Sequence, residues 1–437
     1  MCPLAEILHK EGYELSGSDN NETDTLARVR SLGIPVTLGQ KAENIEGAEL
    51  IVYTAAILPD NPELVAANNS EIPTVERADL LGAITRLYSD CYCVCGTHGK
   101  TTVSSMLTQI MIQCGKDPSA VIGGELPLIH SHGRVGETQN MVCEACEFKD
   151  HFLKLDPDIA IILNVDADHL EHFKNIENII KSFNKFAKMA NKAVIYNGDD
   201  ANTLKAVADV GGKDMITFGL DKSNDFYAEN VEMVNAFAHF DAYKKGEKIG
   251  SVKLKVPGKH NVTNALAALA AADYCGISFD KAIASLEQFG GACRRFEILA
   301  KLNGITFADD YAHHPTELRV TLEAAMQMKY RKVWAVFQPF TYSRTKKLMD
   351  DFAEVLKIPD ECVMTEIMGS REVNTEGVYT SQLAAKIPGS VWFNTFDEVA
   401  DYVLAHVQSG DLVITLGCGD IYKAAKIMIK RLEDANM

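Results

Sequence analysis

Helical and strand-like patterns of apolar residues alternate along the first 88 residues. Leu4–Leu8 and Thr25–Leu32 have the spacing of helices, each followed closely by a glycine. Tyr13–Ser16 and Glu49–Thr54 have the composition of strands, and the second is apolar enough to be buried. Because helices that alternate with strands wind a parallel sheet, this segment is expected to be an α/β domain.

The same alternation continues through the middle of the chain. Strands are predicted at Met141–Glu144, Ile159–Val165 and Ala193–Tyr196, with helices between them. Residues 226–256 change to short alternating stretches, which favour an antiparallel hairpin. An Ala-rich helix is expected at about 262–274.

The last segment begins near residue 293. It contains predicted strands at Val333–Gln338 and Leu412–Leu416, each followed by a polar loop and a helix. We therefore predict an α/β protein of three domains, with boundaries at 1–88, 89–292 and 293–437, the middle domain carrying a small antiparallel part.

Charge and composition narrow the class of protein. The 437 residues have a formal net charge of −17 without a strong basic patch, so no nucleic-acid partner is expected. The longest apolar runs are far shorter than a membrane span, so no membrane insertion is expected. Eleven irregularly spaced cysteines suggest a reducing compartment and favour a cytoplasmic location.

One short polar run follows an apolar strand and precedes an amphipathic helix. It reads Gly96-Thr97-His98-Gly99-Lys100-Thr101-Thr102. Glycines there let backbone N–H groups approach phosphate oxygens, Lys100 reaches the terminal phosphates, and the Thr101 hydroxyl would bind Mg²⁺. A full P-loop has a glycine where Val94 stands, so the match is partial. An ordinary strand–turn–helix is the alternative.

A P-loop enzyme also needs a carboxylate near its metal ion, ideally at the end of a neighbouring strand. Glu144 follows one short apolar strand. Asp166, Asp168 and His169 follow another. His169 is interpreted either as a metal ligand or as a hydrogen-bonded loop residue.

Further polar groups lie nearer the C-terminus. Asn261 and Asn264 share a helix face, from which their amides can meet an adenine edge, although helix capping is the alternative. Arg294 and Arg295 stand at an expected domain junction, either to bring positive charge to a transferring phosphate or as a surface charge pair. A third polar cluster spans Asp309–Pro315.

Read together, these stretches resemble the Mur ligase family, the ATP-dependent amide-forming ligases of peptidoglycan precursor synthesis. The signatures that carry the likeness are Pro3–Leu8, Ser16–Asp19, Tyr53–Ile57, Gly96–Thr102, Asp309–Pro315 and Gln338–Thr345. The resemblance implies a UDP-binding Rossmann-like domain, a central ATPase domain, and a C-terminal Rossmann-like domain that closes over ATP and the amino acid. It further implies that L-alanine is added to the carboxylate of UDP-N-acetylmuramate through an acyl phosphate, with ATP and Mg²⁺ required.

The family pattern also assigns roles residue by residue. Lys100 and Arg295 match its catalytic phosphate-binding positions, and Thr101, Glu144 and His169 match its metal site. The remaining matches are to ATP or the other substrates: Gly96, Thr97, His98, Gly99, Thr102, Asn261, Asn264 and Asp310 for ATP, and Asp19, His313 and Arg344 for the UDP-sugar and amino acid.

Two departures from the family pattern matter. Relatives begin with a strand and a glycine-rich loop, and Met1-Cys2-Pro3 stands where that loop ends, so the first segment of this chain begins on a helix. The chain as written is therefore expected to bind ATP but to hold the UDP-sugar weakly. Phe340 stands where alanine-adding relatives commonly have histidine, which bears on the amino-acid pocket.

Three alternatives stay open on the sequence. A sister ligase on the same fold attaches a preformed peptide to UDP-N-acetylmuramate during cell-wall recycling. A family member with an impaired first domain would bind nucleotide without ligation. A P-loop kinase or signalling NTPase would need neither the third α/β segment nor the Asn-rich helix start.

Overall fold

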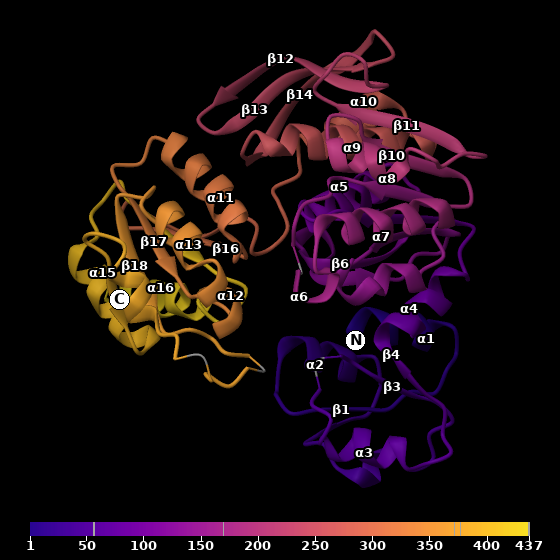
Figure 1. The fold of residues 1–437 in the computed structure, drawn as a ribbon, viewed down its shortest axis with the longest axis horizontal. Coiled ribbons are helices and arrows are strands. Elements are labelled where there is room, and N and C mark those ends of the chain that lie inside the picture. The colour runs from indigo at the N-terminus through magenta and orange to yellow at the C-terminus, as the bar shows by residue number, and fades with distance from the viewer. Residues whose placement is uncertain (56, 169, 371, 376, 436–437) are drawn as a thin grey trace. The chain divides into compact units, whose positions relative to one another are not determined.

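The computed structural model describes residues 1–55, 57–168, 170–370, 372–375 and 377–435 (Figure 1). The chain separates into two compact units. The first comprises residues 1–229, 241–251 and 263–287, and the second comprises residues 230–240, 252–262 and 288–437. Each unit is described by itself.

The first segment of the chain holds short helices and strands. Its elements are α1 (Cys2–Lys10), β1 (Gly17–Asp19), α2 (Asp24–Ser31), β2 (Val36–Leu38), η1 (Ala42–Ile45), β3 (Ile51–Tyr53), α3 (Pro62–Asn68), β4 (Thr74–Glu76) and α4 (Arg77–Thr85). The predicted parallel pairing is confirmed, but the strands form two separate pairs, β1 with β2 and β3 with β4.

Two details of the predicted strands are wrong. The strand predicted to start at Tyr13 and to end at Gly17–Asp19 is paired only over Gly17–Asp19, beginning opposite Val36, and Tyr13 is 61% exposed. The strand predicted at Glu49–Thr54 shortens to Ile51–Tyr53 and is half-buried rather than buried. Strand structure is therefore found only where a neighbouring backbone offers hydrogen bonds.

The middle segment forms the largest sheet. Its elements are β5 (Asp90–Cys95), α5 (Lys100–Gln113), β6 (Ser119–Leu126), η2 (Pro127–Ile129), β7 (Ser131–Arg134), β8 (Asn140–Glu144), η3 (Phe148–Lys154), β9 (Ile159–Ile162), α6 (Leu170–Phe173), α7 (Ile176–Met189), β10 (Ala193–Asn197), α8 (Ala201–Val207), β11 (Asp214–Gly219), β12 (Phe226–Val234), β13 (Phe237–Lys244), β14 (Glu247–Pro257), α9 (His260–Tyr274) and α10 (Phe279–Leu286). The strand order is β14-β13-β12-β11-β10-β9-β5-β8-β6-β7. Strand β5 lies between β8 and β9, parallel to both.

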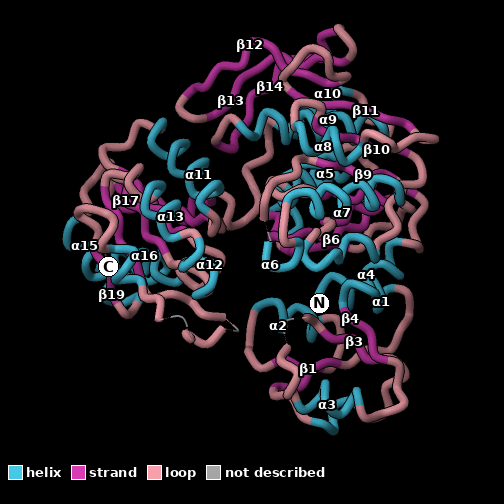
Figure 2. The backbone as a smooth tube through the Cα atoms, viewed as in Figure 1, coloured by secondary structure: helices cyan, strands magenta, loops and turns pink. Residues whose placement is uncertain are grey.

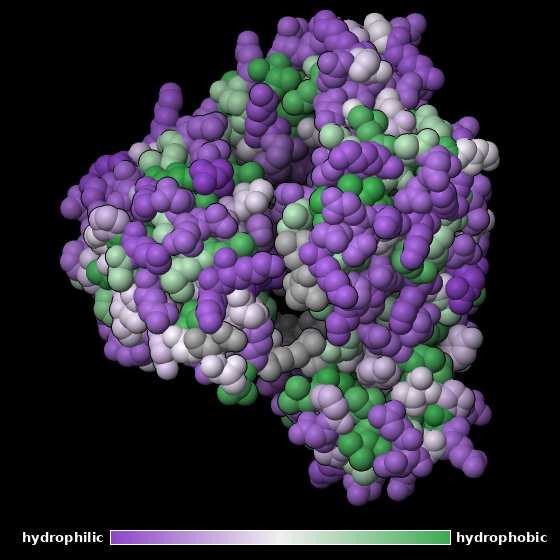
Figure 3. Space-filling view, in the orientation of Figure 1, coloured by the Kyte–Doolittle hydropathy of each residue, from purple (hydrophilic) through white to green (hydrophobic). Residues whose placement is uncertain are grey.

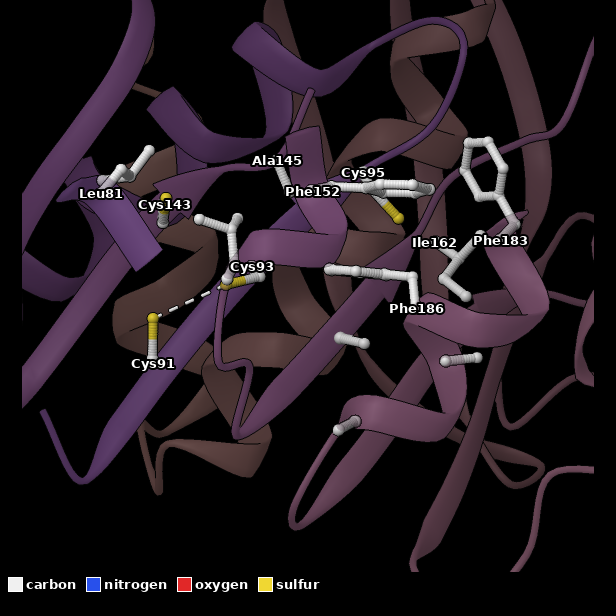
Figure 4. Close-up of a cluster of buried hydrophobic side chains, with 14 of the residues drawn as sticks. Leu81, Cys91, Cys93, Cys95, Cys143, Ala145, Phe152, Ile162, Phe183 and Phe186 are labelled. Atoms are coloured by element: carbon white, nitrogen blue, oxygen red, sulfur yellow. Dashed lines mark hydrogen bonds between the residues drawn. The ribbon is translucent and has the colours of Figure 1, made fainter. Parts of the chain in front are cut away.

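The core of this sheet shows why β5 contains three alternating cysteines. Cys91, Cys93 and Cys95 point to one face, where they join a buried cluster with the aromatic rings of η3 and α7 (Figure 4). In that cluster Phe152 stacks on Phe186 with ring centroids 4.8 Å apart. The thiols therefore act as small apolar side chains, and the loop after β5 follows a strand that is half-buried at Asp90 and buried at every later residue.

The antiparallel part predicted within 226–256 is confirmed. Strands β12 and β13 are joined by Asn235 and Ala236, and β13 and β14 by Lys245 and Gly246. All four of these residues have positive φ, as two-residue hairpin turns of the I′ type require. Connections this short join only antiparallel strands.

The last segment folds into a second α/β layer structure. Its elements are β15 (Glu297–Leu302), β16 (Ile305–Asp310), α11 (Pro315–Gln327), β17 (Val333–Phe337), α12 (Tyr342–Lys347), α13 (Met349–Val355), β18 (Glu361–Thr365), α14 (Thr380–Ala384), β19 (Val391–Phe393), α15 (Phe396–His406), β20 (Leu412–Leu416) and α16 (Tyr422–Ala435). The sheet order is β15-β16-β20-β17-β18-β19, and all neighbours are parallel except β15 with β16.

Helices cover both faces of this second sheet (Figure 2). Alternate residues of β17 point to opposite faces of the sheet. Ala335 and Phe337 pack with α11 and α13 on one face. Trp334 and Val336 pack with α15 and α16 on the other. This arrangement brings the carboxyl ends of β16, β17 and β20 to one edge, which is where ligands bind in such sheets.

The surface is predominantly polar on the face drawn in Figure 3. Apolar side chains gather there over the first segment, whose exposed large apolar residues include Tyr13, Leu32, Leu38, Leu50, Leu58 and Val65. Among the described residues, no helix combines the length and the apolar character needed to cross a membrane.

Candidate active site

The loop between β5 and α5 has the geometry that its glycines suggested. Gly96 has φ +146° and Gly99 has φ +87°, both in the region that favours glycine. A Cβ on Gly96 would lie 2.9 Å from the Leu163 side chain. Gly99 is the N-cap of α5, so the first-turn N–H groups of the helix and the positive end of its dipole meet at the loop. Thr102 follows in the first turn and is half-buried.

The end of β9 holds this loop in place through a residue whose role was missed from the sequence. The Asn164 side chain accepts a hydrogen bond from the His98 N–H at 2.8 Å and donates one to the His98 carbonyl at 3.0 Å. The Thr97 hydroxyl accepts the Asp166 N–H at 2.8 Å. An asparagine directly after a buried strand was the available signal, because its amide can bond both peptide groups of one residue.

Lys100 turns back over the loop. Its Nζ donates to the carbonyls of Gly96 at 2.6 Å and Thr97 at 3.1 Å, and lies 3.0 Å from an oxygen of Glu147. Burial alone would lower the pKa of Lys100, but the nearby carboxylate of Glu147 outweighs it and raises the pKa above its ordinary value. Lys100 is therefore a permanent cation at the place where phosphates would bind. Glu147 is a second residue whose role sequence reasoning missed.

Glu144 reaches the first turn of α5. Its carboxylate accepts the Thr101 hydroxyl at 3.2 Å and the Gly123 N–H at 2.7 Å. A Cβ on Gly123 would lie 2.3 Å from a Glu144 oxygen, so the backbone of β6 approaches the carboxylate as closely as glycine permits. A carboxylate and a hydroxyl held together beside the loop are oxygen donors of the kind that Mg²⁺ prefers, so these residues fit the metal. His169, predicted as a further ligand, lies outside the described residues.

The two asparagines of α9 have different surroundings. Asn264 approaches the P-loop, since a Cβ on Gly99 would lie 2.7 Å from its Oδ1. The Asn261 amide donates to the Pro257 carbonyl at 2.7 Å, which is a contact at the helix start. Both side chains are buried. Asn264 is thus beside the nucleotide loop, while adenine contact and helix capping both stay predictions for the two asparagines.

The adjacent arginines after residue 293 have distinct contacts. Arg294 donates to Asp309 at 2.8 Å and to the Gly417 carbonyl at 2.6 Å, and its guanidinium lies over the rings of Tyr311 and Tyr422. Arg295 lies over the Tyr311 ring, 5.3 Å from its centroid. The surface charge pair considered as an alternative is wrong for Arg294, whose partner Asp309 is 1% exposed.

Asp310, at the end of β16, is buried. Its two oxygens accept the N–H groups of Phe296 and Ala312, both at 2.8 Å. Burial raises the pKa of this carboxyl to about 6, against the opposing charge of Arg295 and these two hydrogen bonds. The Asp310 side chain thereby connects the end of β16 with Phe296, near the start of the last segment. Its expected contact with the ribose of ATP stays a prediction.

The three residues predicted to bind the sugar or amino acid lie on separate elements. Asp19 ends β1, is exposed, and accepts the Asn21 N–H at 3.0 Å. His313 is half-buried, with its Nδ1 3.1 Å from the Tyr311 carbonyl. Arg344 lies on α12, and its guanidinium has no ion pair or hydrogen bond with the described part of the chain. Their substrate contacts stay predictions.

Three family models match consecutive parts of the chain. The model described as "Mur ligase family, catalytic domain" matches residues 1–89, "Mur ligase middle domain" matches residues 94–272, and "Mur ligase, glutamate ligase domain" matches residues 294–419. The chain belongs to the Mur ligase family. The three-domain α/β architecture expected from the resemblance is confirmed, while the domain boundaries chosen from the sequence stay predictions.

Curated relatives share this Mur ligase's sequence over nearly its whole length. The UDP-N-acetylmuramate–L-alanine ligases of Acetivibrio thermocellus and Agathobacter rectalis are each 42% identical to it. The matches cover 98% and 99% of this chain and 93% and 95% of the two relatives.

Solved structures share its fold. The UDP-N-acetylmuramate–alanine ligase of Thermotoga maritima matches this Mur ligase with a TM-score of 0.85 at 28% identity, covering 99% of this chain and 97% of that one. A murein peptide ligase from Psychrobacter arcticus matches with a TM-score of 0.76 at 24% identity, covering 98% and 96%. The second likeness shows the fold alone.

The buried carboxyl of Asp310 predicts how the stability of this Mur ligase depends on pH. Between about pH 4 and pH 6 the folded protein keeps the proton and the unfolded chain loses it, since the folded pKa is about 6 and the ordinary value is 3.8. The free energy of unfolding should therefore fall by about 3 kcal/mol from this group as the pH rises through that window.

Urea unfolding at a series of pH values measures this effect. Asp310→Asn should flatten the pH dependence between about pH 4 and pH 6, whatever its effect on absolute stability. Parallel curves for the two proteins across that window would show that the Asp310 carboxyl does not titrate as described.

Proposed function

We propose that this Mur ligase joins L-alanine to the carboxylate of UDP-N-acetylmuramate, with conversion of ATP to ADP and phosphate. The observation that carries the proposal is a P-loop with its lysine and a strand-end glutamate in place, within a chain 42% identical along its length to ligases named for that reaction. The eleven irregularly spaced cysteines favour a reducing compartment, which supports a cytoplasmic location.

The chemistry explains why ATP is required. A carboxylate is a poor electrophile, because an amine attacking it would have to expel oxide. In the proposed reaction a carboxylate oxygen attacks the γ-phosphorus of ATP, and the bond from that phosphorus to the β–γ bridging oxygen breaks to release ADP. The alanine amine, after losing a proton, then attacks the acyl carbon. Phosphate leaves with the original carboxylate oxygen, and an amide remains.

The residues of the loop supply positive charge to this transfer. The backbone N–H groups in the first turn of α5 face the phosphates, and the Lys100 ammonium adds a full charge. Thr101 and Glu144 would hold Mg²⁺, which neutralises phosphate charge when bound. Asn164 keeps the loop in its binding conformation by clamping both peptide groups of His98.

A substrate-omission assay tests the proposed function. Phosphate release should require ATP, UDP-N-acetylmuramate and L-alanine together, and the product should have the mass of the alanine amide. Release with a preformed muropeptide and not with L-alanine would instead identify a recycling ligase. Nucleotide binding with no release under any combination would identify a member that no longer ligates.

A further inference from the structure

The P-loop lysine is already paired with a carboxylate of the same protein. Nζ of Lys100 lies 3.1 Å from Oε1 and 3.0 Å from Oε2 of Glu147, so both carboxylate oxygens face the ammonium. The Lys100 side chain is 15% exposed and that of Glu147 is 4% exposed. This pair is therefore largely shielded from the solvent that weakens surface ion pairs.

Glu147 has no other cation among the described residues. It follows β8 by a short link and is the N-cap of η3, with its backbone carbonyl accepting the Asp150 N–H at 2.9 Å. Glu144, on the same segment, faces Thr101 and Gly123 instead. Two glutamates three positions apart thus have separate partners, one at the hydroxyl of the loop and the other at its ammonium.

The phosphates of ATP need the same ammonium. The buried carboxylate of Glu147 lies within hydrogen-bonding distance of Lys100 and supplies the negative charge that a phosphate would otherwise supply. The same carboxylate repels an incoming phosphate. The three N–H donors of the Lys100 ammonium are all engaged, by the carbonyls of Gly96 and Thr97 and by the carboxylate of Glu147. A phosphate that takes the ammonium must therefore loosen the contact with Glu147.

We propose that Glu147 competes with the phosphates of ATP for the Lys100 ammonium and so sets how tightly the site holds nucleotide. The inference rests on the proposed function, because it takes ATP as the ligand of the loop. It makes Glu147 a positioning residue that acts through Lys100. Keeping nucleotide affinity moderate favours release of ADP after each turnover.

A neutral replacement separates this role from a purely structural one. Glu147→Gln keeps the shape but leaves Lys100 without a counter-ion, a state that nucleotide relieves by supplying negative charge. The Kd for ADP should therefore fall about tenfold, which corresponds to about 1.4 kcal/mol. The KM for ATP should fall with it, while kcat should fall because ADP leaves more slowly.

The experiment measures ADP binding to the full chain by calorimetry, with Mg²⁺ and with EDTA, for the native protein and Glu147→Gln. Glu137→Gln is the matched control, since it removes the same charge from an exposed ion pair with Lys10 and should leave the Kd unchanged. Glu147→Asp, which keeps the charge but draws it back from Lys100, is a second variant. It should also bind ADP more tightly than the native protein.

The outcomes are distinct. Tighter ADP binding by Glu147→Gln, or by Glu147→Asp if the glutamine variant does not fold, supports the competition. Unchanged or weaker binding overturns it, because Glu147 would then be a neutral or a favourable neighbour of the nucleotide. No ADP binding by the native protein would contradict the proposed function itself, whatever the variants do.

Discussion

Lys100→Ala should lower the rate of alanine-dependent phosphate release by a factor of at least about 100. The ammonium is the only full positive charge that the loop itself supplies, and it is held charged by Glu147. Its contribution grows as negative charge moves onto the transferring phosphoryl group, so kcat should fall more than the affinity for ATP. Steady-state kinetics with saturating UDP-sugar and alanine measure both.

The controls must separate lost chemistry from lost stability. Lys100→Ala leaves Glu147 buried without its partner, which alone costs about 3 to 5 kcal/mol of folding free energy. The double variant Lys100→Ala/Glu147→Gln removes that buried charge and should be folded yet just as slow. Lys185→Ala, an exposed lysine on α7, should behave as the native protein. Near-native turnover by the folded double variant would contradict the assignment of Lys100.

Glu144→Gln should reduce kcat/KM by at least about 100-fold and raise the Mg²⁺ concentration needed for half-maximal rate. The glutamine keeps the side-chain length, so the contact with the Gly123 N–H can persist. What it loses is the negative charge facing the Thr101 hydroxyl, which is the property that a divalent cation requires.

A titration of Mg²⁺ against the initial rate tests this effect of Glu144. Glu177→Gln, an exposed residue in the first turn of α7, removes the same charge elsewhere and serves as the matched control. An Mg²⁺ dependence of Glu144→Gln equal to that of the control would show that Glu144 does not contribute to a metal site.

The P-loop could be predicted from the sequence because its determinants are local. Glycines at positions that need positive φ, an apolar strand before them and an amphipathic helix after them all lie within one short stretch. Glu144 could be predicted for a related reason. The carboxyl ends of parallel strands share one edge of a sheet, so a polar residue ending β8 comes close to the loop that ends β5.

Other features depend on tertiary contacts that no local pattern encodes. Asn264 approaches Gly99 only because α9 packs beside the loop, and Asn164 clamps His98 only because β9 pairs with β5. Glu147 was overlooked since a glutamate beyond a strand end has the pattern of a solvated residue, and only its burial against Lys100 shows otherwise. Residues 13–16 also show the effect of tertiary contacts, because no neighbouring strand pairs with them and they form no strand.

This Mur ligase is expected to activate a sugar carboxylate by phosphorylation before the amide forms. UDP-N-acetylmuramate labelled with oxygen-18 in its carboxylate tests it most directly, with L-alanine, ATP and Mg²⁺ present and the released phosphate analysed by mass spectrometry. Each phosphate released should carry one labelled oxygen, and the amide should keep the other. Unlabelled phosphate, released whether or not alanine is present, would contradict it.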